Sequence, residues 1–391
     1  MSARIHVDAA WKSLFHYGEE LCGDRVMIRR NEDSFVMVLA DGLGSGVKAN
    51  ILSTLTSKII SEMIFEGLPL YEAVETIAAT LPVCSEREVA YSTFTILQVD
   101  YSGKARLAQY DNPIAVFIRR NQVLDYEKKE VMISGKKIYE SEFMLEPDDH
   151  ILFFSDGILY ADTEMKLNYD WGQSDVEAFL GAAITDEDPA RECARILLAM
   201  VNSLYDGKPS DDCTVAAARI IPATETVVMA GPPKNKENDE KVLSRLMKAS
   251  GQRIVCGGTT SQIVARYLQT DVVPDTDTPM SDVPPKAFIK GIDLVTEGLI
   301  TMQKVSLLLR HSCKDPEFYE DLLLSKEEDG ATLLVKALAD SSAVTFLLGL
   351  SENAGHHNLG SDVSLEAKKL VVREIASSLE ELGKIVSIEE L

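Results

Sequence analysis

Residues 34–52 read SFVMVLADGLGSGVKANIL and join a strand pattern to a helix pattern through a glycine-rich turn. Residues 34–40 are almost wholly apolar, which is typical of a buried strand. From residue 47 the apolar side chains recur at helical spacing, at Ile51, Leu52, Leu55, Ile59, Ile60, Met63 and Ile64. Asp41 stands at the end of the strand, so the sheet fixes the position of its carboxylate.

Two further aspartates stand at strand ends. Residues 150–157, HILFFSDG, place Asp156 after an apolar strand, and residues 208–215, KPSDDCTV, place Asp211 and Asp212 directly before another. Each Asp-Gly pair alone predicts no more than a turn. Three such motifs predict carboxylates that converge, and clustered oxygens of this kind favour the hard cations Mg²⁺ and Mn²⁺. Gly42 leaves its own carbonyl reachable as a further ligand.

The first half of the chain shows an α+β pattern rather than strict βαβ alternation. We expect a hairpin over 25–41, helices from 47 and over 70–80, an antiparallel meander over 92–126, a strand over 150–157, a helix over 189–205 and a strand over 214–221.

A domain boundary is predicted at about residue 222, where a strand ends at Pro222 and the charged run 234–241 follows. Strand patterns and helix patterns alternate over residues 223–391, which predicts a smaller α/β domain. Its strands are expected over 225–231, 253–258, 287–295, 343–350 and 384–391, and its helices over 237–249, 259–268, 299–312, about 316–341 and 362–383.

The best candidate for a ligand loop in the second domain is CGGTTS, residues 256–261. In an α/β domain such loops gather at the carboxyl edge of the sheet, where ligands usually bind. One interpretation is an anion or metabolite site that serves an effector. The other is that Thr259 or Thr260 caps a helix. Dimerisation or partner docking through residues 223–391 is equally compatible with the sequence.

Composition excludes several classes of partner. The 391 residues carry 39 basic and 62 acidic side chains, a net charge of −23, which opposes binding to nucleic acid or an anionic membrane. No run approaches the ~18 apolar residues of a membrane helix, and the N-terminus shows no signal-peptide pattern. The six cysteines form no CxxC pair, so we expect reduced thiols in a cytoplasmic protein.

The order ADGLGSG, FFSDG and SDDCTV over residues 40–46, 153–157 and 210–215 resembles the metal-dependent (PPM, type 2C) protein phosphatases. The resemblance is greatest to the bacterial branch named for stage II sporulation protein E (SpoIIE), and it covers about residues 10–221. It implies an antiparallel β-sandwich flanked by helices for residues 1–222. It also implies a serine/threonine phosphoprotein phosphatase, acting on a substrate such as an anti-sigma-factor antagonist.

The resemblance also implies roles for individual residues. Asp41, Gly42, Asp156 and Asp211 match the ligands of two Mn²⁺ or Mg²⁺ ions, and Asp24 matches an early acidic position expected to act through water. Asp212 is expected to support the ligands from behind. The N–H groups of Gly44, Ser45 and Gly46 open the helix that follows and are expected to contact substrate phosphate.

The mechanism that the resemblance implies is direct hydrolysis by a water shared between two cations. Eukaryotic members carry a histidine after the first Asp-Gly pair as a proposed general acid, whereas this chain has Leu43, which leaves the general acid unassigned. None of the six histidines lies in a motif, so packing or surface roles are expected for them. The alternative to an active enzyme is a catalytically silent regulatory module on the same scaffold, and the intact aspartates favour the enzyme.

Overall fold

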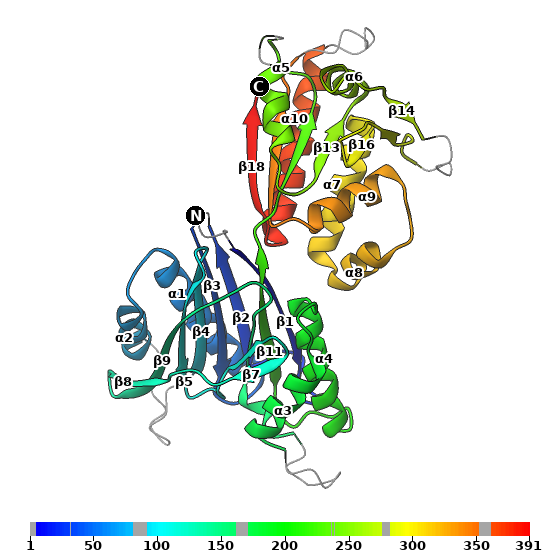
Figure 1. Cartoon of the computed structure of the whole chain (residues 1–391). Helices are drawn as coiled ribbons and strands as arrows, with labels where there is room; N and C mark the ends of the chain where they lie inside the picture. The colour runs from blue at the N-terminus through cyan, green and yellow to red at the C-terminus, as the bar shows by residue number, and fades with distance from the viewer. Residues whose placement is uncertain are drawn as a thin grey trace. The chain divides into compact units, whose positions relative to one another are not determined.

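The computed structural model describes residues 5–31, 33–80, 92–161, 171–235, 237, 239–275, 282–351 and 361–391. The chain divides into two compact units, Met1–Pro222 and Ala223–Leu391 (Figure 1).

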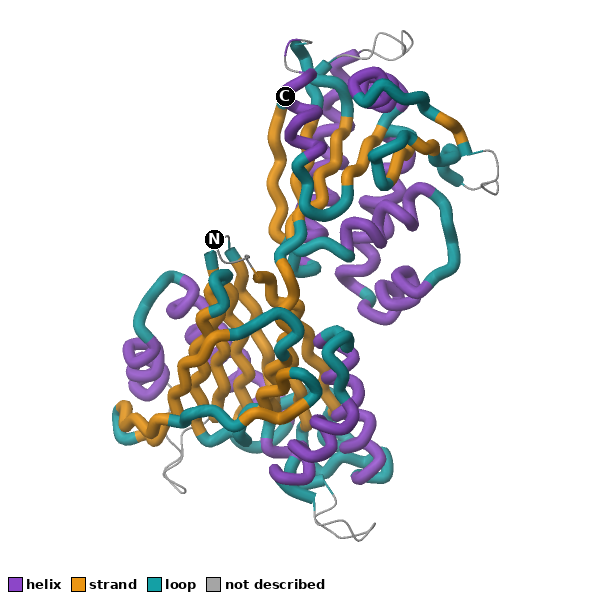
Figure 2. The backbone as a smooth tube through the Cα atoms, in the orientation of Figure 1, coloured by secondary structure: helices purple, strands orange, loops and turns teal. Residues whose placement is uncertain are grey.

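The described part of the N-terminal unit contains two antiparallel sheets (Figure 2). One has five strands, in the spatial order β1 (Ile5–Leu14), β11 (Cys213–Pro222), β10 (His150–Phe154), β6 (Val116–Arg119) and β7 (Gln122–Leu124). The other has six, in the order β2 (Asp24–Arg30), β3 (Ser34–Gly42), β4 (Ser92–Asp100), β5 (Lys104–Tyr110), β9 (Lys136–Met144) and β8 (Lys129–Ile133).

Helices cover the outer face of each sheet. The six-stranded sheet packs against α1 (Gly46–Phe65) and α2 (Leu70–Thr80), and the five-stranded sheet packs against α3 (Gln173–Ala183) and α4 (Ala190–Leu204). The expected antiparallel β-sandwich flanked by helices is therefore confirmed for this unit.

Strand β3 shows why the apolar run 35–40 has no polar face. Its residues alternate between two buried surfaces: Val36, Val38 and Ala40 pack toward α1, whereas Phe35 and Met37 point to the opposite face, and all are fully buried. A strand covered on both faces reads as a continuous apolar run. Burial on both sides holds the end of the strand rigidly, which fixes Asp41.

Several elements differ from the sequence prediction. The expected meander over 92–126 is wrong as a single sheet, because β4 and β5 belong to the six-stranded sheet whereas β6 and β7 belong to the other. The chain changes sheets over residues 111–115. Strands β1, β8 and β9 and helix α3 were not predicted at all.

The described part of the C-terminal unit has one sheet, in the order β14 (Val273–Pro274), β15 (Ala287–Phe288), β16 (Leu294–Thr296), β13 (Arg253–Cys256), β12 (Glu225–Ala230), β17 (Ala343–Leu348) and β18 (Ile385–Glu390). From β16 to β18 all pairings are parallel. One face packs against α7 (Leu299–Lys314), α8 (Pro316–Leu324), α9 (Gly330–Ala339) and α10 (Ser361–Glu381), and the other against α5 (Asp239–Met247) and α6 (Gly258–Tyr267). The expected α/β architecture is confirmed.

Two predicted elements of this unit are wrong in detail. The helix expected over about 316–341 is two helices, because Asp329 accepts hydrogen bonds from the N–H groups of Ala331 and Thr332 and starts α9 anew. The strand expected over 287–295 is also divided, into β15 and β16, with a turn at Gly291 (φ 95°) between them.

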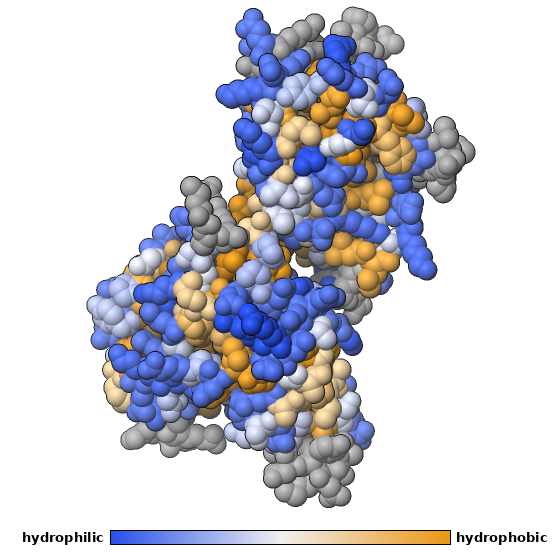
Figure 3. Space-filling view, in the orientation of Figure 1, coloured by the Kyte–Doolittle hydropathy of each residue, from blue (hydrophilic) through white to orange (hydrophobic). Residues whose placement is uncertain are grey.

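Hydrophilic side chains are spread over the visible face of both units (Figure 3). Across the described residues we find no helix that combines the length and the apolar character needed to cross a bilayer.

Candidate metal centre

A cavity of about 360 Å³ lies where β3 and β10 end and β11 begins. Asp41, Asp156 and Asp211 line it, one carboxylate from each of the three strand-end motifs. The rest of the lining consists of His16, Gly42, Leu43, Gly44, Ser45, Ser92, Thr93 and Ser210. Residues more than 100 positions apart in the sequence therefore meet at one point because both sheets end there.

The glycines after Asp41 and Asp156 are required by close backbone packing. A Cβ on Gly42 would lie 2.1 Å from the carbonyl oxygen of Ala49 in α1, and a Cβ on Gly157 would lie 2.2 Å from that of Asp212. Real Cβ atoms do not approach a backbone oxygen so closely. In each Asp-Gly pair the aspartate supplies a carboxylate, and the glycine allows another backbone segment to pack directly against the strand end.

The carboxyl groups of Asp41 and Asp156 lie close enough for each to affect the pKa of the other. Burial, together with the neighbouring charges of Asp24, Asp156 and Asp211, raises the pKa of Asp41 well above its usual range. Burial likewise raises the pKa of Asp156, and burial with the charge of Asp156 raises the pKa of Asp211. Neighbouring buried carboxyl groups are costly to ionise together. A bound cation would stabilise their ionised forms.

Asp24 lies behind this group rather than on the cavity wall. It is 5% exposed and pairs with Asp41 across β2 and β3. Its Oδ2 accepts a hydrogen bond from Ser155 Oγ at 2.7 Å, whereas its Oδ1 is buried with no partner among the described residues. Burial is the main cause that raises its pKa to about 7, and the charges of Asp212 and Asp211 add to it.

Asp212 holds two loops together beneath the cavity. Its Oδ1 accepts the N–H of His16 at 3.0 Å and its Oδ2 accepts the N–H of Gly23 at 2.8 Å. The side chain is 4% exposed and does not line the cavity. This contact pattern suits a residue that positions other groups.

Two buried thiols, those of Cys22 and Cys213, lie close to these aspartates. Burial raises the pKa of Cys22 to about 12, with the charges of Asp24 and Asp212 adding to the effect. Burial also raises the pKa of Cys213, whose Sγ donates to the carbonyl of Asp211 at 3.5 Å. Every cysteine among the described residues is free.

The start of α1 holds the three residues expected to contact phosphate. The helix begins at Gly46, and its N-cap Ser45 makes no side-chain capping bond. Ser45 Oγ instead donates to Glu19 Oε1 at 3.2 Å, and a Cβ on Gly46 would lie 2.9 Å from Glu19 Oε2. A carboxylate thus lies beside the helix N-terminus, where an anion is favoured. No sequence motif pointed to Glu19.

His16 is the cavity residue that the sequence analysis missed. It lines the cavity, although a packing or surface role was expected for it, and its Nδ1 is buried with no partner among the described residues. Its charge lowers the pKa of Asp211, against the larger raising effect of burial. Its position 25 residues before Asp41, outside any motif, offered no sequence signal.

The donor set fits a hard divalent cation. The described residues contain no three histidine, cysteine or acidic side chains already placed as a closed metal site. The cavity nevertheless offers carboxylate oxygens from Asp41, Asp156 and Asp211, and a bound cation would offset the effects that raise the pKa of each of them.

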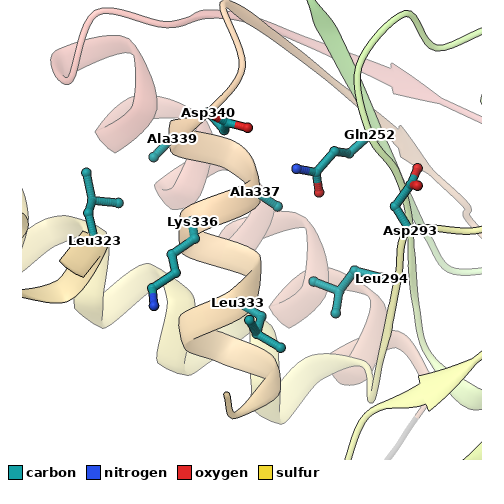
Figure 4. Close-up of a pocket in the computed structure, with 9 residues that line it drawn as sticks. All are labelled: Gln252, Asp293, Leu294, Leu323, Leu333, Lys336, Ala337, Ala339 and Asp340. Atoms are coloured by element: carbon teal, nitrogen blue, oxygen red, sulfur yellow. The ribbon is translucent and has the colours of Figure 1, made fainter. Parts of the chain in front are cut away.

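The C-terminal unit has a cavity of its own, of about 460 Å³ (Figure 4). Its lining consists of Gln252, Asp293, Leu294, Leu323, Leu333, Lys336, Ala337, Ala339 and Asp340. Gln252 and Asp293 directly precede β13 and β16, so the cavity lies at the amino ends of these parallel strands.

The loop CGGTTS lies at the opposite edge from this cavity, at the carboxyl end of β13. Helix α6 begins at Gly258 with Gly257 as its N-cap. The interpretation of Thr259 or Thr260 as the cap is therefore wrong, because Gly257 (φ 111°) already makes the turn into the helix.

Comparisons with known proteins concern the N-terminal unit. The family model described as stage II sporulation protein E (SpoIIE) matches residues 31–221. Stage II sporulation protein E of Bacillus subtilis strain 168 is 23% identical over 198 residues, which is 50% of this chain. The match spans only 23% of the length of that relative.

Solved structures show the same similarity at low identity. The PP2C phosphatase domain of SpoIIE from Bacillus subtilis, with a fragment of its regulatory domain, aligns with a TM-score of 0.49 and 21% identity, covering 57% of this chain and 65% of that one. RsbX in complex with magnesium aligns with a TM-score of 0.40 and 16% identity, covering 55% of this chain and 96% of that one.

Proposed function

We propose that this chain hydrolyses phosphoserine and phosphothreonine in a protein substrate with the help of two Mn²⁺ or Mg²⁺ ions, because the SpoIIE family model matches residues 31–221. The observation that supports this most is the meeting of Asp41, Asp156 and Asp211 in one cavity. The alternative, a silent regulatory module, has no observation in its favour, because every acidic position of the motif is present.

The residues in and around the cavity would have different roles in the reaction. Asp41, Asp156, Asp211 and the carbonyl of Gly42 would hold the cations, with Asp24 acting through water. Cations held there would supply charge neutralisation for the phosphoryl oxygens and a water of lowered pKa. Asp212 would keep the loops of His16 and Gly23 in place through its two hydrogen bonds.

Gly44, Ser45 and Gly46 would receive substrate phosphate at the N-terminus of α1. The Glu19 carboxylate beside Ser45 and Gly46 repels a phosphate, so it must swing away when substrate binds. Glu19 is exposed, and such a movement costs little packing.

His16 would supply the proton that Leu43 cannot. Its backbone N–H is fixed by Asp212, and its ring lines the cavity that would hold the phosphoryl group. When the P–O bond breaks, the electron pair passes to the serine or threonine oxygen, and an imidazolium in this position would protonate it.

The first test is hydrolysis of p-nitrophenyl phosphate and a phosphoserine peptide with Mn²⁺, with EDTA, and by Asp156→Asn. We expect turnover with Mn²⁺, none with EDTA, and a loss of at least about 100-fold in the variant, because Asn keeps the shape but removes the charge that holds a cation. Asp33→Asn, on the exposed turn between β2 and β3, is the control. A folded wild type that shows no turnover with any divalent cation would refute the proposal.

The proposal extends to the identity of the substrate and to the role of the C-terminal unit. A small phosphorylated regulator, such as an anti-sigma-factor antagonist, suits a SpoIIE-like domain by family analogy. Residues 223–391 would bind an effector or a second copy of the chain. The acidic composition suits a protein in the cytoplasm that binds neither nucleic acid nor membrane.

A further inference from the structure

A second cavity of the N-terminal unit, of about 700 Å³, lies between the β6–β7 hairpin and α3. On the helix side it is lined at helical spacing by Ser174, Glu177, Ala178 and Gly181, which form one face of α3. On the sheet side it is lined by residues 114–117, 121–126 and 128. We call this space the edge cleft. Its volume lies within the usual range of ligand sites.

Strand β7 is the last strand of its sheet, so one of its edges is unpaired. The hairpin turn consists of Arg120 and Asn121, both with positive φ (52° and 58°), which is a two-residue turn of the type that twists with the strands. In such a hairpin Arg119 and Gln122 exchange both hydrogen bonds, and the next pair, Ile118 and Val123, exchanges none. The N–H and C=O of Val123 therefore face the open edge.

Nothing in the described part of the chain occupies these two groups. Neither the N–H nor the C=O of Val123 has a hydrogen-bond partner there outside its own hairpin. Gly181 approaches the Val123 side chain, to which an added Cβ would lie 3.1 Å away, so α3 packs over the face of the hairpin and leaves the edge open. An unpaired strand edge is the usual receptor for an extended peptide.

The segment of residues 111–115 connects the edge cleft with the cavity that Asp41, Asp156 and Asp211 line. At one end of the segment Asn112 accepts a hydrogen bond from the hydroxyl of Thr93, which lines that cavity. At its other end the carbonyl of Ala115 accepts the hydroxyl of Tyr126 at 2.7 Å, and the carbonyl of Ile114 accepts Gln173 Nε2 at 2.9 Å.

The geometry points to the edge cleft as the docking site for the polypeptide that flanks the phosphorylated residue: an extended segment of the phosphoprotein substrate adds to β7 by hydrogen bonds to Val123. The inference rests on the proposed phosphatase function. It names which part of the substrate is recognised, namely main chain in extended conformation, with α3 forming the opposite wall.

The sharpest test removes one donor. Val123→Pro deletes the outward N–H without touching the ladder to β6, and Pro is tolerated at a strand edge that faces away from its neighbour. Val123→Ala loses the same side chain but keeps the N–H. We expect Val123→Pro to raise KM for phosphorylated α-casein about three- to tenfold, with Val123→Ala close to wild type and kcat/KM for p-nitrophenyl phosphate unchanged in both.

A second pair of variants tests the space itself. Ala178→Trp fills the cleft from an exposed position on α3, whereas Ala182→Trp is exposed on the same helix but does not line it. Only Ala178→Trp is expected to raise KM for phosphorylated α-casein. The inference is wrong if neither Val123→Pro nor Ala178→Trp raises KM for casein above that of its control variant. It is also wrong if p-nitrophenyl phosphate turnover falls in parallel with casein turnover.

A binding readout keeps the inference independent of turnover. In the Asp156→Asn protein, amide hydrogen exchange at Val123 should slow when a phosphoserine peptide of about ten residues is added in excess. Unchanged exchange at Val123 would overturn docking even in an active enzyme. A wild type without turnover but with protected Val123 would overturn the phosphatase proposal and leave the docking site standing.

Discussion

At the scale of single residues, the buried carboxyl of Asp24 has a consequence for stability. A group whose pKa is raised on folding binds its proton more tightly in the folded state, so the free energy of unfolding falls as pH rises from about 4 to about 7. Asp24→Asn should reduce this slope in the metal-free protein and gain at most about 4 kcal/mol at pH 8. Urea unfolding in EDTA at pH 5 and pH 8 measures it.

Asp33→Asn, on the exposed turn between β2 and β3, is the matched control for that experiment and should keep the wild-type slope. If Asp24→Asn keeps it as well, the carboxyl of Asp24 is not protonated in the folded protein.

His16 can be tested by the choice of leaving group. p-Nitrophenolate leaves without a proton, whereas a serine alkoxide needs one. His16→Gln should therefore lower kcat for a phosphoserine peptide about 100-fold and for p-nitrophenyl phosphate less than about threefold. His311→Gln, an exposed histidine of the C-terminal unit, should change neither. An equal loss on both substrates would mean that His16 only maintains the shape of the cavity.

The residues of the site divide into those with a sequence signal and those without. Asp41, Asp156 and Asp211 were identifiable because each stands in a motif at the end of an apolar strand, and the structure brings all three to one cavity. His16 and Glu19 lie on the loop after β1, and only the pairing of β1 with β11, about 200 residues away, carries them to the cavity. No local pattern records a pairing of that range.

At the scale of elements, the junction between β3 and α1 is the tightest contact of the site. Gly42→Ala would place a methyl group 2.1 Å from the Ala49 carbonyl, so β3 or α1 must move. We expect a loss of at least about 3 kcal/mol in the free energy of unfolding and no measurable metal-dependent turnover. Urea denaturation measures the first quantity.

Gly172→Ala is the control for that junction, because its Cβ would meet nothing closer than Asp175 Oδ2 at 3.9 Å. A Gly42→Ala protein as stable as Gly172→Ala would show that α1 yields easily and that the first Asp-Gly pair is not held by packing.

The elements that the sequence predicted are those buried on both faces. β3 and β10 are continuous apolar runs and were identified. β8, the edge strand, and its neighbour β9 contain several lysine and glutamate residues among their apolar ones and were not identified. Helix α3 was missed because it buries only Val176 and Leu180 completely. The break between α8 and α9 was missed because residues 325–329 are common in helices, and the signal there was the cap at Asp329.

At the scale of the whole molecule, each unit has hydrophobic clusters of its own. The clusters around α1, and around α3 and α4, use only residues before 222, and those of the second unit use only residues after 223. We expect residues 1–222 alone to keep metal-dependent turnover and residues 223–391 alone to unfold cooperatively. Calorimetry of the two fragments and an assay of the first measure this. An unfolded second fragment would contradict it.

The buried thiols close to the candidate metal centre affect how the protein would respond to oxidants. Peroxides and electrophiles attack the thiolate, and burial raises the pKa of Cys22 and of Cys213, which keeps both thiols protonated at neutral pH. The proposed activity uses a water nucleophile, so with these thiols shielded it would persist at oxidant concentrations that inactivate enzymes with a catalytic cysteine.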